Sequence, residues 1–157
     1  VCSSDLRMLH YPPIHRLPAD QVRAAAHEDI NLITLLPMAS APGLEVRDLE
    51  GRWHEVRCDP GAVVVNYGDM LSLCTDHFYP STTHRVANPP SELFDTERLS
   101  MPLFLHPRDN VMLSEDRSAG AYLHERLHEQ QTPRQDRHRA PPPHPQPRGN
   151  LHPDLRS

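Results

Sequence analysis

Short apolar runs, several of them rich in β-branched residues, recur at intervals of about ten residues through most of this chain, and Gly, Pro and Asp separate them. The runs are too short for typical helices, and their spacing is typical of an all-β sandwich or barrel. We expect strands at residues 6–11, 30–36, 44–48, 53–57, 62–66, 83–87 and 99–105.

Local patterns add detail to this all-β expectation. Glu50-Gly51 separates two of the runs, and glycine supplies the positive φ of a tight turn, so the pattern predicts an antiparallel hairpin. The run 62–65 does not alternate, which predicts a strand covered on both faces. Ala119, Tyr122, Leu123 and Leu127 follow helical spacing and predict one amphipathic helix that closes the domain.

The composition changes near Gln131, where a segment rich in Pro, Arg and His begins. Such a segment has too few large apolar residues to bury a core. We therefore expect a folded domain at residues 1–130 and a disordered tail at 131–157. The prolines at 141–147 favour polyproline II, so the tail is either a solvated extension or a ligand for a proline-recognising module.

Charge and cysteine content limit the classes of partner. The 16 basic residues against 21 acidic ones give a net charge of −5, which argues against nucleic acid as a partner. No apolar run is long enough to cross a bilayer, and the first residues lack the pattern of a signal peptide. Cys2, Cys58 and Cys74 are widely spaced and odd in number, so we expect no disulfide framework and a cytoplasmic protein.

Three residues have the types and spacing of a metal site. In an extended segment, His27 and Asp29 lie on the same face because side chains alternate. His84 begins another expected strand and can supply a third ligand from across a sheet. Two histidines and one carboxylate form the facial triad of non-heme Fe(II) oxygenases. The alternative is that His27 and Asp29 are surface polar residues preceding a strand.

Arg98 and Ser100 form a second polar pair, again two residues apart. On one strand face, a guanidinium and a hydroxyl together suit a carboxylate ligand, because arginine can donate to both oxygens. Taken alone, the pair could equally be an exposed arginine on an edge strand.

In this order, these elements resemble a known enzyme family. His27-x-Asp29, His84-Arg85-Val86 and Arg98-x-Ser100 occur together with Pro42-Gly43-Leu44-Glu45-Val46, Glu50-Gly51-Arg52-Trp53 and Asn66-Tyr67-Gly68-Asp69-Met70-Leu71. Together they resemble the Fe(II)/2-oxoglutarate-dependent dioxygenases of the isopenicillin N synthase-like family. The resemblance runs from about Leu6 to about Leu127. It implies a double-stranded β-helix, or jelly roll, with the metal at one mouth.

The resemblance also implies roles for individual residues. His27, Asp29 and His84 would bind Fe(II), Arg98 and Ser100 would hold the cosubstrate 2-oxoglutarate, and Tyr11 would reach the same cosubstrate. The expected reaction uses dioxygen to hydroxylate or desaturate a small organic molecule, with succinate and CO2 as co-products.

Members of this family carry a substantial N-terminal region before the strand that holds the tyrosine. The resemblance therefore implies an incomplete jelly roll in this chain and leaves an alternative function open. That alternative is an inactive metal-binding or structural jelly-roll fragment.

Overall fold

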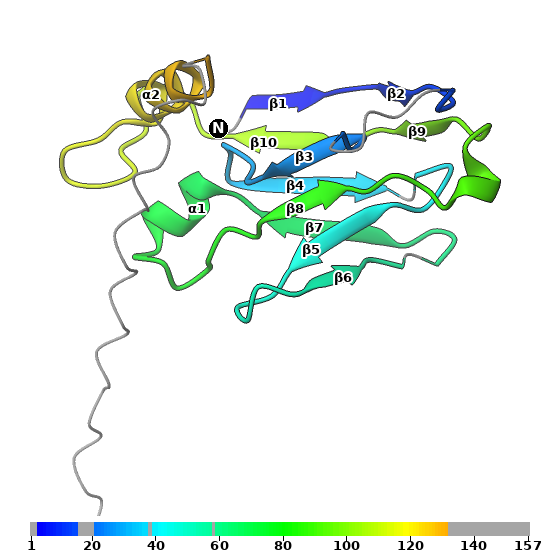
Figure 1. The fold of residues 1–157 in the computed structure, drawn as a ribbon. Coiled ribbons are helices and arrows are strands. Elements are labelled where there is room, and N and C mark those ends of the chain that lie inside the picture. Colours follow the sequence, from blue (N-terminus) through cyan, green and yellow to red (C-terminus); the bar gives the residue numbers. More distant parts are fainter. Residues whose placement is uncertain (1–2, 16–20, 38, 58, 132–157) are drawn as a thin grey trace, which may run out of the picture.

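The computed structural model describes residues 3–15, 21–37, 39–57 and 59–131, and it is built mainly from two facing β-sheets (Figure 1). Its strands are β1 (Ser3–Leu6), β2 (Leu9–Tyr11), β3 (Ala24–His27), β4 (Ile33–Pro37), β5 (Leu44–Arg47), β6 (Trp53–Glu55), β7 (Val63–Tyr67), β8 (His84–Val86), β9 (Arg98–Ser100) and β10 (Leu103–His106). The helices are α1 (Asp69–Cys74), the 3-10 turn η1 (Ser91–Leu93) and α2 (Ala119–Gln131). This confirms the predicted all-β jelly roll with a C-terminal helix.

The first sheet has the strand order β1-β10-β4-β7, and β2 pairs with β9 beside it. Residues 6–11 and 99–105 were each predicted as one strand, but each is interrupted near its middle. Pro102 lies at the break between β9 and β10, and proline has no N–H to donate to a ladder. The Arg7 N–H donates to the Pro102 carbonyl oxygen at 3.0 Å, and this hydrogen bond connects the β1–β10 ladder to the β2–β9 ladder.

The second sheet has the order β3-β8-β5-β6, with every pairing antiparallel. The predicted hairpin joins β5 to β6, and Gly51 in its turn has a φ of +83°. The Arg47 and Arg85 guanidinium groups lie over the Trp53 ring, which anchors β6 to the rest of the sheet.

Besides the short turn η1, the structure holds two elements that were not predicted. β3 is a run of alanines ending in His27, and its residues have little β-propensity of their own, so pairing with β8 decides its conformation. α1 has only six residues, and its first backbone N–H groups bond to carbonyls of residues 29 and 31. Both elements depend on partners far away in the sequence.

The prediction that residues 62–65 are covered on both faces was wrong. Val63 and Val65 are 51% and 54% exposed, because they lie on the outer face of β7, an edge strand of its sheet. Val64 and Asn66 point the other way and line a cavity between the sheets.

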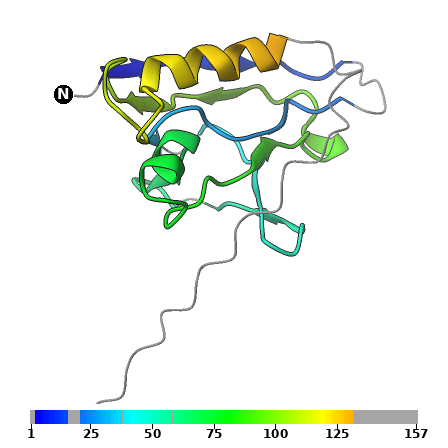
Figure 2. The same ribbon diagram turned by 90° about the vertical axis from the view of Figure 1, so that its left-hand side faces the viewer.

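α1 and α2 lie at the same end of the sandwich, as the two ribbon views show (Figures 1 and 2). Tyr122 and Leu123 of α2 pack on a small core made by Met70, Leu113 and Ala119. This confirms the predicted helix, although Leu127 is 44% exposed. In the part of the chain that the structure describes, no helix has the length and apolar character needed to span a membrane. The expected tail falls almost wholly outside the described residues.

Candidate metal centre

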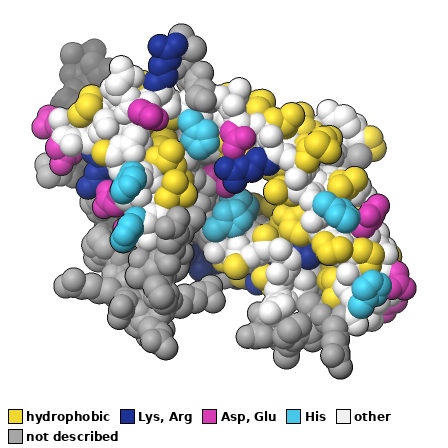
Figure 3. All heavy atoms as spheres, turned by 90° about the horizontal axis from the view of Figure 1, so that it is seen from above, with side chains coloured by type: hydrophobic (Ala, Val, Ile, Leu, Met, Phe, Trp, Pro, Cys, Tyr) yellow, Lys and Arg dark blue, Asp and Glu magenta, His cyan; other side chains and the backbone are white. Residues whose placement is uncertain are grey.

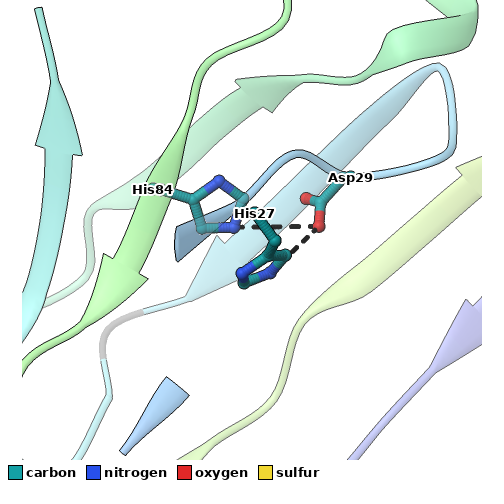
Figure 4. Close-up of side chains that lie close together, drawn as sticks. All are labelled: His27, Asp29 and His84. Carbon is teal, nitrogen blue, oxygen red and sulfur yellow. Dashed lines mark ion pairs between the residues drawn. The ribbon is translucent and has the colours of Figure 1, made fainter. Parts of the chain in front are cut away.

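His27 and His84 are brought together by the pairing of β3 with β8. The two residues are direct partners in this antiparallel ladder, and their ring centroids lie 4.3 Å apart. Asp29 follows β3 by two residues and is 8% exposed. Its Oδ1 atom lies 3.8 Å from His27 Nε2 and 3.7 Å from His84 Nε2 (Figure 4).

The three groups have the arrangement of a metal-binding set. One ligand atom from each residue lies within 4.8 Å of the others, and the described residues hold no other such cluster of His, Cys, Asp or Glu. Ligands that bind one ion at right angles with bonds of about 2.1 Å lie about 3 Å apart. The two distances from Asp29 Oδ1 to the imidazoles, 3.8 and 3.7 Å, exceed this by less than about 1 Å, and the widest separation in the set, within 4.8 Å, exceeds it by up to about 1.8 Å.

The histidine tautomers also suit a metal. His27 Nδ1 lies 2.8 Å from the Ala25 carbonyl oxygen, and His84 Nδ1 lies 3.0 Å from the Thr82 carbonyl oxygen. A carbonyl can only accept a hydrogen bond, so each Nδ1 carries the proton. Each Nε2 then keeps its lone pair and faces Asp29, which is the usual way an outer contact orients a metal-binding histidine.

The backbone around Asp29 is held by the end of β7 and the start of α1. The N–H groups of Gly68, Asp69 and Met70 donate to the carbonyls of Leu32, Asp29 and Asn31, at 2.9, 2.8 and 3.0 Å. This contact requires glycine at position 68 on steric grounds, since a Cβ there would lie 2.8 Å from the Asp29 carbonyl oxygen and nearer still to Asn31. The φ of Gly68 is −102°, so backbone strain is not the reason.

Asp29 Oδ2 has partners that the sequence analysis did not identify. Thr34 Oγ1 donates to it at 2.5 Å and Asn66 Nδ2 at 3.0 Å, and Asn31 Nδ2 in turn donates to Thr34 Oγ1 at 2.8 Å. The available signal was a polar residue inside an apolar strand, as Asn66 is after Val63-Val64-Val65.

Arg98 and Ser100 lie on one face of β9, as predicted, and both are buried. Arg98 is 2% exposed and donates from Nε to the Ala41 carbonyl at 3.0 Å, while its Nη1 is buried with no hydrogen-bond partner among the described residues. Burial lowers the pKa of this guanidinium. Tyr11 is paired with Arg98 across the β2–β9 ladder, and its ring lies 5.3 Å from the guanidinium carbon.

All six predicted site residues line one cavity between the sheets, with a volume of about 160 Å³. Most of its remaining wall is apolar, from side chains such as Leu36, Val64 and Phe104. The cavity is small compared with sites for drug-sized ligands, which span about 300–1,000 Å³. It therefore combines a three-ligand cluster, a buried cation and a mostly apolar wall.

Comparisons of sequence and of structure with known proteins agree with each other on one family. A family model described as the 2OG-Fe(II) oxygenase superfamily matches residues 2–107. The 2-oxoglutarate-dependent dioxygenase citB of Monascus ruber is 46% identical over 90 residues, covering 53% of this chain and 26% of the relative.

Two solved structures are similar over most of the chain. A putative oxygenase from Shewanella oneidensis is 49% identical with a TM-score of 0.71, covering 81% of this chain and 47% of that one. A putative 2OG-Fe(II) oxygenase family protein from Caulobacter crescentus is 42% identical with a TM-score of 0.71, covering 82% and 46%. The chain thus spans about a quarter of that curated relative and less than half of these solved structures.

Proposed function

Because this chain belongs to the 2OG-Fe(II) oxygenase superfamily, we propose that its protein is a 2-oxoglutarate-dependent dioxygenase that oxidises a small organic molecule. The observation that carries the proposal is the convergence of His27, Asp29 and His84, whose ligand atoms lie within 4.8 Å of one another. When bound, Fe(II) supplies the redox chemistry by which dioxygen attacks a substrate C–H bond. In a hydroxylation, one oxygen atom enters the product and the other enters succinate, and 2-oxoglutarate loses CO2.

The donor set fits Fe(II) and an anionic chelator. Two neutral imidazoles and one carboxylate leave a divalent ion with one net positive charge, and a facial set of three ligands leaves three positions open. The residual charge attracts a keto acid, which two further carboxylate ligands would repel. His27, Asp29 and His84 are the proposed ligands.

Arg98 is the proposed anchor for the far carboxylate of 2-oxoglutarate. A buried guanidinium with no acidic partner among the described residues is costly, and a bound carboxylate would satisfy both its charge and its Nη1 donor. Ser100, two residues along the same face, is proposed to donate its hydroxyl to that carboxylate. Tyr11 is proposed to complete this subsite because it lies directly opposite Arg98.

The direct test is anaerobic addition of Fe(II) and 2-oxoglutarate, followed by visible absorption. Chelation of iron by the keto acid gives a weak charge-transfer band, which we expect with the native chain and not with Asp29→Ala. A folded native protein that gives no band with both additions would contradict the proposal.

The small volume of the cavity, about 160 Å³, favours a second candidate, a metal-binding jelly roll without turnover. Under this alternative, the chain binds Fe(II) and 2-oxoglutarate but forms no succinate with any substrate. Succinate release, measured with and without a panel of small organic acids and aromatics, separates the two candidates.

The proposed partner is a small molecule rather than nucleic acid or a membrane. The net charge of −5 supports this, and basic groups on the face shown in Figure 3 stand singly, several beside acidic side chains. A cytoplasmic location belongs to the same proposal, supported by Cys74, which forms no disulfide within the part of the chain that the structure describes. Cell fractionation with an antibody against the chain tests that location.

A further inference from the structure

The two oxygens of Asp29 lie in different surroundings. Oδ1 faces Nε2 of both histidines, at 3.8 and 3.7 Å. Oδ2 accepts hydrogen bonds from Thr34 on β4 and Asn66 on β7, the neighbouring strand of the same sheet. The carboxylate therefore has one oxygen directed at the metal cluster and one oxygen held by the opposite sheet.

The direction of the Thr34 hydrogen bond follows from its other neighbour. Asn31 Nδ2 donates to Thr34 Oγ1 at 2.8 Å, so the hydroxyl accepts there. The single hydroxyl proton is left for the 2.5 Å contact with Asp29 Oδ2. Asn31 is fully buried and Thr34 is 4% exposed, so water does not easily replace either contact.

We propose that Thr34 and Asn66 are positioning residues that restrict Asp29 to a single metal bond, through Oδ1. Turning the carboxylate to bring Oδ2 onto the ion would break two hydrogen bonds in a buried site. A carboxylate bound through both oxygens would occupy one of the three open positions. In the proposed reaction the keto acid would use two of these positions and dioxygen the third, so the contacts of Thr34 and Asn66 would keep all three open.

This inference rests on the proposed function, and its test uses the metal alone. Co(II) is a suitable probe because its visible absorption spectrum depends on coordination number and geometry. The variants are Thr34→Val and Asn66→Leu, which keep side-chain size close to native but remove the donor. Thr34→Ser restores the hydroxyl, and Val64→Ala is the matched control because Val64 lines the same cavity with a side chain that has no hydrogen-bond donor.

We expect Thr34→Val and Asn66→Leu to weaken Co(II) binding by about 10- to 100-fold, the usual effect of removing an outer contact from a metal ligand. We also expect their Co(II) spectra to differ from the native one, whereas Thr34→Ser and Val64→Ala keep the native spectrum. Thermal unfolding without metal shows whether each variant folds. If either Thr34→Val or Asn66→Leu does not fold, the comparison is made with the one that does.

The remaining outcomes contradict the inference. Native affinity in both variants would show that the contacts do not support the ligand. Weaker binding with an unchanged spectrum would show that they stabilise the fold without controlling the bonding of Asp29. If the native chain itself binds no Co(II) or Fe(II), the proposed function fails first, and this result is distinct from the other two.

Discussion

His27 and His84 face each other as direct partners in the antiparallel β3–β8 ladder, although they lie far apart in the sequence. Their Nδ1 atoms each donate to the carbonyl of the residue two positions earlier, which leaves both Nε2 atoms directed at Asp29 Oδ1. The sheet thus fixes both the separation and the tautomers of the two imidazoles.

Asp29 and Arg98 are predicted to have separable roles. Asp29→Ala removes the anionic ligand and should abolish binding of both Fe(II) and 2-oxoglutarate. Arg98→Ala should leave Fe(II) affinity close to native but raise the 2-oxoglutarate concentration for half-saturation by about 10- to 100-fold, because charge-assisted hydrogen bonds contribute about 1.5–3 kcal/mol. Arg57→Ala, at an exposed arginine paired with Glu55, is the matched control. An equal loss of Fe(II) affinity in Asp29→Ala and Arg98→Ala would contradict this separation of roles.

Gly68→Ala is predicted to damage the metal centre through the backbone. The added Cβ would collide with Asn31 and with the Asp29 carbonyl oxygen, so the ligand loop must move. We expect a loss of thermal stability together with at least tenfold weaker metal binding.

Gly51→Ala provides the contrast to that substitution. Nothing lies within 4 Å of a Cβ at position 51, and the only cost is its φ of +83°, about 1–2 kcal/mol. We expect a lower melting temperature with native metal affinity. Native metal affinity in Gly68→Ala as well would show that the contact with Asp29 is not needed.

Tyr122 should make the protein less stable at high pH. Burial and the neighbouring Asp69 raise the pKa of Tyr122 to about 12. The folded state therefore keeps the phenol proton more tightly than the unfolded state, whose tyrosine pKa is about 10. This stabilisation is complete below pH about 10 and is lost as the pH rises towards about 12.

The contribution of Tyr122 is about 1 kcal/mol after allowance for its partly exposed ring. Urea unfolding at pH 9 and at pH 11 measures it, with Tyr122→Phe as the comparison. The native chain should lose more unfolding free energy than Tyr122→Phe between these two values. An identical loss of unfolding free energy in both proteins would show that ionisation of Tyr122 does not cause the loss of stability at high pH.

Acidification is predicted to release the metal reversibly. A protonated imidazole has no free lone pair, so protons compete with the ion for Nε2 of His27 and His84. Co(II) titrations at decreasing pH should show falling affinity while circular dichroism still reports a folded protein. Metal affinity that stays constant across the acidic range would contradict ligation by these histidines.

Most of the strands could be predicted because their apolar runs are bounded by Pro, Gly and Asp, as at Pro37 and Gly51. β3 could not, because its alanines carry no β-signal and only the ladder with β8 makes them extended. The exposure of Val63 and Val65 could not either, because an apolar run looks the same whether or not another element covers it.

By itself, the sequence determined which residue types stand in which order: the two histidines and the aspartate, the arginine and serine after them, and the strand pattern that carries them. The tertiary structure alone decided that these residues share one cavity and that Arg98 is buried without an acidic partner among the described residues. It also decided that Thr34 and Asn66 hold Oδ2 of Asp29. The physical reason is that hydrogen bonds and burial depend on contacts between strands far apart in the chain, and local sequence preference does not encode those contacts.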